Sequence, residues 1–134
     1  ESDIFDLASI TKVISTTSAI MKLYDQGLID LQKPVIDYLP AFKGNQSKYF
    51  IQKEKITIQN LLTHTSGLPP FEQYYLINGN SDSRLDSVYN TGPIYGISDT
   101  TVYSDVGIIV LGKVIESLTK VSLDEYTKKI SLSH

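Results

Sequence analysis

The segment from Val106 to Leu118 is the feature that most limits how this chain can fold. Its apolar side chains recur at spacings of three and four residues, which is the period of an α-helix. One helical face carries Val106, Ile109, Val110, Val114 and Leu118, and Ile108, Leu111 and Ile115 widen it. An apolar face this broad predicts a helix that is buried on several sides and surrounded by other elements.

A second apolar stretch predicts a helix over 9–26, with Gly27 as its C-terminal stop. The β-branched residues between Thr11 and Thr17 weaken helix propensity, so we expect this helix to depend on packing. Its apolar positions recur at helical spacing: Ile10, Val13, Ile14, Ala19, Ile20 and Leu23, with Met21 and Tyr24 beside them.

The rest of the chain predicts short helices joined by loops. A helix with Pro34 in its first turn is expected to end at Pro40, and Thr57 is expected to cap another through Leu62. Residues 41–55 are predicted to be a polar loop, and 66–70 a firm break. The stretch 71–102 is predicted to be a loop with one short helix at 83–90. A last helix is expected over 122–130, where Ser122 and Glu125 can form a capping box. Strand signals are scarce, so the predicted fold class is mainly α.

Composition excludes several classes of protein. The 134 residues suit one domain, and 12 basic against 15 acidic side chains give a net charge of −3, which argues against nucleic-acid binding. There is no cysteine, and two histidines are too few for a histidine-built zinc site. No apolar run reaches the roughly 20 residues needed to span a bilayer. Both ends look cut, so we expect residues 1–134 to be a single partial domain of something larger.

Ser9-Ile10-Thr11-Lys12 has the pattern Ser-x-x-Lys. Residues three apart share a helical face, so the Ser9 hydroxyl and the Lys12 ammonium can approach each other. A serine becomes a good nucleophile only when a neighbouring group takes its proton, and a lysine can do this if its pKa is lowered. The pattern also occurs at Ser117-Leu118-Thr119-Lys120, which is predicted to be a helix end on the surface.

Three further segments follow Ser9 and Lys12 in order: 26–35, 56–69, and Tyr103-Ser104-Asp105 before the apolar stretch that starts at 107. In this order the chain resembles the serine β-lactamase and penicillin-binding-protein superfamily, in its class C-like and esterase-like branch, from about Phe5 to Ile130. The resemblance implies the helical subdomain of an α+β fold. It also implies Ser9 as the acylated nucleophile, Lys12 and Tyr103 as its proton-transfer partners, position 105 as a substrate contact, and no metal or organic cofactor.

Asp105 departs from the family pattern, which usually has asparagine there. An asparagine amide both donates and accepts hydrogen bonds, whereas an ionised aspartate only accepts. A carboxylate beside Lys12 would favour the charged ammonium and make it a poorer base. Either Tyr103 carries more of the proton transfer, or the preferred substrate differs from a classical penicillin.

The family's third motif, Lys-Thr-Gly or His-Thr-Gly on a strand, has no match in this chain. That strand supplies one oxyanion-hole donor in the family, and losing one such donor costs about 100- to 1000-fold in rate. We therefore expect this chain to be catalytically incompetent by itself. We also expect the sheet-facing side of helix 9–26 to be bare, which would favour self-association.

Two interpretations of function stay open. The first is part of a serine hydrolase that forms an acyl-enzyme with a β-lactam, a D-amino-acid peptide of the peptidoglycan type, or an ester. The second is a non-catalytic helical module that keeps the motifs by descent. His64 is predicted to serve packing and turn hydrogen bonds rather than proton transfer, and Asn45-Gln46-Ser47 fits a glycosylation sequon. Related enzymes are often exported, although nothing in the sequence fixes the compartment.

Overall fold

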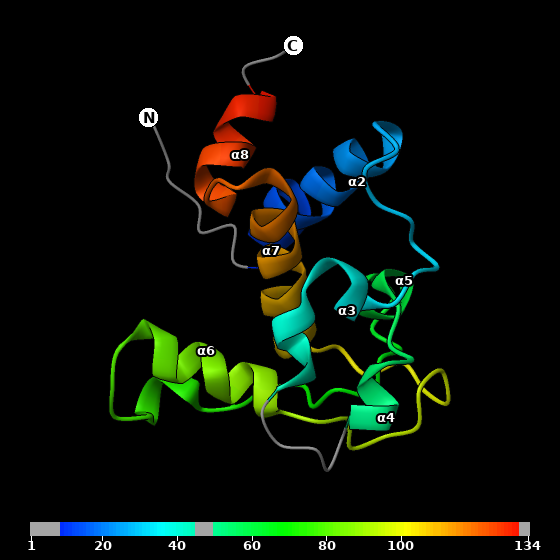
Figure 1. Cartoon of the computed structure of the whole chain (residues 1–134), viewed down its shortest axis with the longest axis vertical. Helices are drawn as coiled ribbons and strands as arrows, with labels where there is room; N and C mark the ends of the chain where they lie inside the picture. The colour runs from blue at the N-terminus through cyan, green and yellow to red at the C-terminus, as the bar shows by residue number, and fades with distance from the viewer. Residues whose placement is uncertain (1–8, 45–49, 132–134) are drawn as a thin grey trace, which may run out of the picture.

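The computed structural model describes residues 9–44 and 50–131 of the chain. Within these residues the regular elements are helices, and the β pairing is one isolated antiparallel bridge between Pro34 and Thr57. This confirms the mainly α prediction. Figure 1 shows α7 running through the middle of the molecule, with α8 at one end and α6 projecting to one side at the other.

The central helix α7 spans Asp105–Thr119, close to the predicted 106–118. It begins where the Ser104 hydroxyl accepts the backbone N–H of Gly107 at 3.1 Å, which makes Ser104 its N-cap. α7 contacts α3 (Val35–Tyr38), α5 (Ile58–Leu62), α8 (Leu123–Ser131) and the turn η1 (Val13–Thr17). The predicted burial is confirmed for Val106, Val110, Leu111, Val114 and Ile115, which are at most 1% exposed. It is wrong for Ile109, which was predicted on the same face and is 40% exposed.

The predicted helix 9–26 forms in three parts: α1 (Ile10–Lys12), the π-helical turn η1 and α2 (Ser18–Asp25). The apolar residues of this helix do not all lie in the same environment. Ala19, Ile20 and Leu23 are buried, whereas Ile10 and Ile14 are 57% and 51% exposed. A π turn takes more residues per turn than an α-helix, so positions before it fall out of phase with the buried face after it.

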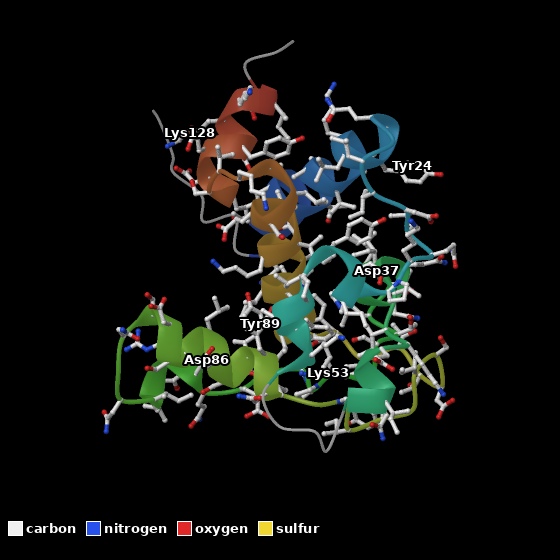
Figure 2. All side chains as sticks on the ribbon, viewed as in Figure 1. Tyr24, Asp37, Lys53, Asp86, Tyr89 and Lys128 are labelled. Atoms are coloured by element: carbon white, nitrogen blue, oxygen red, sulfur yellow. The ribbon has the colours of Figure 1, made fainter. Side chains whose placement is uncertain are left out.

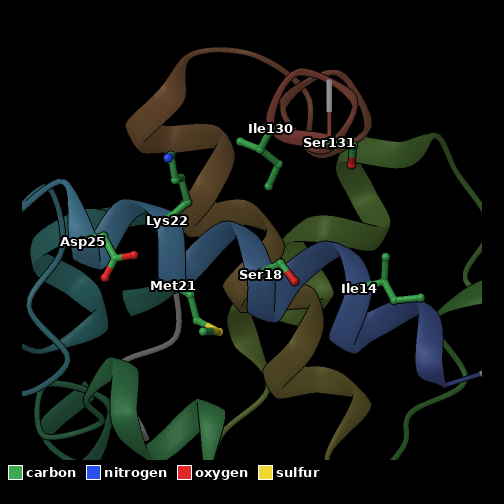
Figure 3. A pocket seen from close by; sticks show the side chains of 7 residues that line it. All are labelled: Ile14, Ser18, Met21, Lys22, Asp25, Ile130 and Ser131. Atoms are coloured by element: carbon green, nitrogen blue, oxygen red, sulfur yellow. The ribbon is translucent and has the colours of Figure 1, made fainter. Parts of the chain in front are cut away.

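This helix keeps exposed apolar side chains, as expected. Large apolar side chains are exposed along it and just beyond its end: Ile10, Ile14, Met21, Tyr24 and Leu28. Figure 3 shows the side chains that line a recess here, among them Ile14 of η1, Met21 of α2, and Ile130 and Ser131 of α8. That a sheet covers this side stays a prediction.

The predicted capping role of Thr57 is confirmed. The Thr57 hydroxyl accepts from the Asn60 backbone N–H at 3.1 Å, and the Asn60 side chain accepts from the Thr57 backbone N–H at 3.0 Å. The extended backbone before this cap pairs with the segment that leads into α3, because Val35 N–H donates to the Ile56 carbonyl at 2.8 Å. Pro34 is the N-cap of α3 and not part of its first turn, since its ψ of 142° is extended.

The predicted loop at 41–55 is wrong where the structure describes it. Pro40–Lys43 forms a 3₁₀ helix, η2, and Phe50–Lys53 forms α4. Lys53 is only 1% exposed and donates to the backbone carbonyls of Phe42 and Tyr89, with its ammonium 4.6 Å from the centre of the Phe42 ring. Figure 2 labels Lys53 and Tyr89 in this lower part of the molecule. Buried donors and apolar packing, which a polar sequence pattern does not reveal, hold this segment in place. The sequon at 45–47 lies outside the described residues.

The remaining helices follow the sequence expectations closely. The short helix expected at 83–90 is α6 (Ser81–Asn90), which begins earlier because Asn80 caps it by accepting from the Ser83 N–H at 3.1 Å. It is preceded by a 3₁₀ turn, η4 (Tyr74–Leu76). α8 begins after Ser122, whose hydroxyl accepts from the Glu125 N–H at 3.2 Å. Gly67 has φ of +76°, and an added Cβ there would collide with the Tyr95 carbonyl, so the break at 66–70 needs this glycine.

Candidate functional site

The start of the first helix brings Ser9 and Lys12 together. The Lys12 ammonium donates to Ser9 Oγ at 3.1 Å, and the Lys12 backbone N–H donates to the Ser9 carbonyl at 3.1 Å. This turn produces the side-chain contact that the spacing of three residues predicts. Ser9 is exposed, so an electrophile in solution can reach its hydroxyl.

Tyr103 completes a three-residue contact around Ser9. Its hydroxyl donates to Ser9 Oγ at 3.3 Å, from a position 94 residues further along the chain. The Lys12 ammonium also lies 5.8 Å from the centre of the Tyr103 ring, within the range of a cation–π contact. Ser9 Oγ is therefore within hydrogen-bond distance of two groups that can exchange protons with it.

Asp105 pairs with Lys12 at the first residue of α7. Lys12 Nζ lies 3.2 Å from Asp105 Oδ1, and the two side chains are 31% and 38% exposed. Asp105 Oδ1 is buried and has no well-formed hydrogen bond within the described part of the chain, so the ammonium supplies its electrostatic compensation. The interaction with Tyr103, and after it the one with the Asp105 carboxylate, raise the pKa of Lys12. Lys12 is thus held as a cation in this arrangement, as the carboxylate at position 105 predicts.

His64 supports the backbone on which Tyr103 and Asp105 sit. Its Nδ1 accepts the Ser104 N–H at 3.1 Å, and its carbonyl accepts the Val102 N–H at 2.9 Å. Its ring lies against Tyr103 with 4.6 Å between centroids. Burial lowers the pKa of His64, against the opposing charge of Asp105, which keeps Nδ1 free to accept. These contacts are the packing and turn hydrogen bonds predicted for His64.

Two further hydrogen bonds fix the residues between Tyr103 and α7. The Ser104 hydroxyl donates to the Pro69 carbonyl at 2.6 Å, and the Asp105 N–H donates to the Pro70 carbonyl at 2.9 Å. These two hydrogen bonds fix the start of α7 against the turn at 66–70, and they thereby fix the position of Asp105 relative to Lys12.

The second Ser-x-x-Lys match has a different environment. Ser117 donates its hydroxyl to the Tyr38 carbonyl at 2.8 Å, and Lys120 is an exposed C-cap with φ of +62°. The left-handed backbone at Lys120 ends α7, which confirms the prediction of a surface helix end. The same four-residue pattern thus serves as a helix terminus here.

Two recesses flank Lys12. One of about 380 Å³ is lined by Ser9, Lys12, His64 and Tyr103, together with Thr17 and three aliphatic side chains. The other, of about 240 Å³, is lined by Lys12, Phe71, Glu72, Tyr74, Asp105, Val106, Ile108 and Ile109. Sequence analysis missed Glu72 and Phe71, because their nearness to Lys12 depends on how the loop after Pro70 folds back along α7.

Metal sites and membrane-spanning helices are both absent from residues 9–44 and 50–131. These residues contain no group of three or more histidine, aspartate or glutamate side chains placed to hold a metal ion. None of their helices is long and apolar enough to cross a membrane.

The fold and this group of side chains define a class. The described residues form the helical part of a β-lactamase-type fold. The chain superposes on the D-stereospecific amidohydrolase from Streptomyces sp. with a TM-score of 0.74 at 25% identity, over 93% of this chain and 40% of that one. The family model described as Beta-lactamase matches residues 1–129, and the chain belongs to this family. The superfamily expected from the sequence is thereby confirmed.

Two curated relatives show how much of such a protein the chain spans. It is 34% identical to an N-acetylmuramyl-L-alanine amidase from Bacillus subtilis (strain 168), over 93% of this chain and 30% of the relative. It is 33% identical to a putative D-alanyl-D-alanine carboxypeptidase from Salmonella paratyphi B, over 97% of this chain and 33% of the relative. The chain therefore spans about a third of the length of these relatives.

Proposed function

We propose that this chain supplies the nucleophile-bearing part of a serine hydrolase that acts through an acyl-enzyme. The observation that carries the proposal is the position of Ser9 Oγ, 3.1 Å from the Lys12 ammonium and 3.3 Å from the Tyr103 hydroxyl. A hydroxyl between two proton-exchanging groups is the arrangement that activated serine nucleophiles require. Membership of the Beta-lactamase family supports this reaction class.

The geometry favours different roles for Tyr103 and Lys12. Asp105 and Tyr103 keep Lys12 charged, so its contribution is to hold the Ser9 oxygen and to stabilise negative charge that develops near it. Tyr103, as the phenolate that the Lys12 cation stabilises, is then the group that takes the Ser9 proton as the carbonyl is attacked, and the phenol so formed returns that proton to the leaving group. The incoming water would give up its proton along the same path during deacylation.

The substrate classes consistent with the family are β-lactams, D-amino-acid peptides of the peptidoglycan type, and esters. The relatives named above are an amidase and a putative D-alanyl-D-alanine carboxypeptidase, both of which are named for amide or peptide chemistry. Asp105 favours a substrate other than a classical penicillin, because an ionised carboxylate cannot donate a hydrogen bond to a side-chain carbonyl.

The second candidate is a non-catalytic helical module derived from the same family. It is favoured by the ion pair between Lys12 and Asp105, which weakens Lys12 as a base.

Intact-mass spectrometry after exposure to a fluorophosphonate, and separately to a penicillin, tests the proposal. Both the 134-residue chain and the complete product of its reading frame are used. We expect a stoichiometric adduct at Ser9 in the complete product that is lost in Ser9→Ala. Ser117→Ala is the matched control, because it removes the serine of the other Ser-x-x-Lys sequence and should leave labelling intact. An adduct on the 134-residue chain would show that the site assembles from these residues alone. A complete product that does not label would favour the non-catalytic module.

A further inference from the structure

His64 occupies a position in a turn where glycine is the usual residue. It follows Thr63, the C-cap of α5, and its backbone is left-handed with φ of +57°. The His64 N–H donates to the Leu61 carbonyl at 3.3 Å. The Thr65 N–H donates to the Asn60 carbonyl at 2.8 Å, which completes a Schellman motif with His64 at its left-handed position. Glycine takes this conformation at the least cost, so a large side chain here points to a use outside the turn.

His64 binds the residues on both sides of Tyr103. Its carbonyl accepts the Val102 N–H at 2.9 Å, and its Nδ1 accepts the Ser104 N–H at 3.1 Å. Between these two hydrogen bonds the imidazole lies against the Tyr103 ring, with 4.6 Å between the centroids. Three contacts from one residue therefore fix the backbone and the ring of the tyrosine whose hydroxyl lies 3.3 Å from Ser9 Oγ.

The contact with Ser104 depends on the protonation state of the imidazole. A neutral imidazole can accept a hydrogen bond at Nδ1, whereas an imidazolium carries a proton on both nitrogens and only donates. After protonation, Nδ1–H and the Ser104 N–H would face each other as two donors, and the hydrogen bond would be lost. Burial lowers the pKa of His64, which favours the neutral form at pH 7, and Asp105 acts in the opposite direction. The other titratable groups that line the same recess are Lys12 and Tyr103.

From this arrangement we propose that His64 is the positioning residue for Tyr103, and that it holds the tyrosine against Ser9 only while its imidazole is neutral. His64 itself exchanges no proton with the substrate. Its protonation releases the segment that carries Tyr103, so the acylation rate falls at acidic pH. This inference rests on the proposed acyl-enzyme function and adds to it a positioning residue and an acidic limit.

Two substitutions separate the role of the side chain from that of the turn. His64→Gly removes the imidazole and suits the left-handed backbone, so the chain should still fold. His64→Asn restores an acceptor, because asparagine Oδ1 is bonded to Cγ as histidine Nδ1 is, and asparagine tolerates the left-handed region. At pH 7.5 we expect His64→Gly to slow the labelling of Ser9 by a neutral fluorophosphonate about tenfold, and His64→Asn to stay within about threefold of wild type. Rates are measured on the complete product of the reading frame and normalised to the folded fraction from circular dichroism.

The pH dependence of labelling tests the protonation step. The measured quantity is the ratio of the wild-type rate to the His64→Asn rate, in which ionisations that both proteins share cancel. We expect this ratio to be constant from pH 7 to 8 and to fall about three- to tenfold between pH 7 and 5. Its midpoint should equal the pKa of the His64 imidazole measured by NMR. His134→Asn removes the other histidine of the 134 residues and is the matched control, which should keep the wild-type profile.

Three results would overturn this inference while Ser9 labelling still supported the proposed function. They are a ratio that stays flat from pH 7 to 5, a His64→Gly variant that labels as fast as wild type, and a His64→Asn variant that labels as slowly as His64→Gly. Failure of Ser9 to label in the wild-type protein at any pH would overturn both.

Discussion

Lys12 and Lys53 show two opposite ways of placing a lysine in one small fold. Lys12 is 31% exposed and lies beside Tyr103 and a carboxylate, which raise its pKa. Lys53 is 1% exposed and donates to the carbonyls of Phe42 and Tyr89, and burial lowers its pKa to about 8. Backbone carbonyls satisfy an ammonium's hydrogen bonds, but they carry no full negative charge to offset its desolvation.

The comparison teaches that the lysine with the lower pKa is not the one in the candidate site. A lysine that is to act as a base at neutral pH needs the environment of Lys53, without a carboxylate nearby. Lys12 has the environment of an electrostatic partner. Lys53 links η2 to α6 by donating a hydrogen bond to one backbone carbonyl of each, which gives it a role in stability.

The largest expected effect is the loss of Ser9 labelling in Lys12→Met, with Lys53→Met as the comparison. Lys12→Met should slow fluorophosphonate labelling of Ser9 by about 100-fold, because it removes the cation that contacts Ser9 Oγ. Lys53→Met should leave the labelling rate of the folded protein within about threefold. Labelling rates of both variants, normalised to the folded fraction from circular dichroism, check this. Equal losses in the two variants would remove the functional distinction between the lysines.

The second prediction concerns stability between pH 8 and 9.5. The folded-state pKa of Lys53, about 8, lies below the ordinary value near 10.4, so the unfolded chain binds the proton that the folded chain has released. The free energy of unfolding should therefore rise by about 2 kcal/mol across this window, and below pH 8 the desolvation cost is fully present. Urea unfolding at pH 7.5, 8.5 and 9.5 measures the rise.

Lys53→Met supplies the control for this pH dependence, because it should abolish the rise while lowering stability at every pH. Burial raises the pKa of Tyr74, Tyr89 and Tyr126, so these groups oppose the effect only as the pH passes about 10. A wild-type stability that is flat from pH 7.5 to 9.5 would contradict the assignment of Lys53.

The smallest expected effect is that of Asp105→Asn, which would make Lys12 resemble Lys53 more closely. Removing the carboxylate withdraws one of the two causes that raise the pKa of Lys12. In the variant Lys12 can lose its own proton at a lower pH and take the Ser9 proton beside Tyr103, so the pH at which labelling reaches half its maximum should fall by up to about one unit and labelling at pH 7 should increase several-fold. Rate profiles from pH 6 to 10 for wild type and variant are the measurement, with Asp124→Asn on α8 as the control. A profile that does not move would show that Lys12 does not govern labelling.

Local signals in the sequence predicted much of this structure. The caps at Thr57 and Ser122 are local hydrogen bonds between residues three apart. The apolar residues of α7 recur at helical spacing, so its own sequence predicts the helix. The contact between Ser9 and Lys12 follows from the same spacing, whereas Tyr103 and Asp105 were placed beside them by family resemblance alone.

Features that depend on distant segments could not be predicted. Lys53 looks like a loop lysine until η2 and α6 close over it. Glu72 comes near Lys12 only because the loop after Pro70 returns along α7. The exposure of Ile10 and Ile14 depends on a π turn that the β-branched residues of this segment do not predict. In the first two cases the deciding contact joins residues far apart in the chain. In the third case the deciding feature is a local geometry whose energy is close to that of the α-helix.

The π turn η1 also has a consequence for how this chain tolerates changes in length. It separates Ser9 and Lys12 from the buried residues of α2, and a turn of this kind accommodates one residue more than an α-helical turn. Deleting one residue from Val13–Thr17 would turn η1 into an ordinary helical turn and leave the core contacts of Ala19, Ile20 and Leu23 in place. The same deletion would rotate Ser9 and Lys12 by roughly 100° about the helix axis. A single residue thus keeps Ser9 in phase with the buried residues of α2, and its loss would produce a folded chain in which Ser9 faces away from Tyr103.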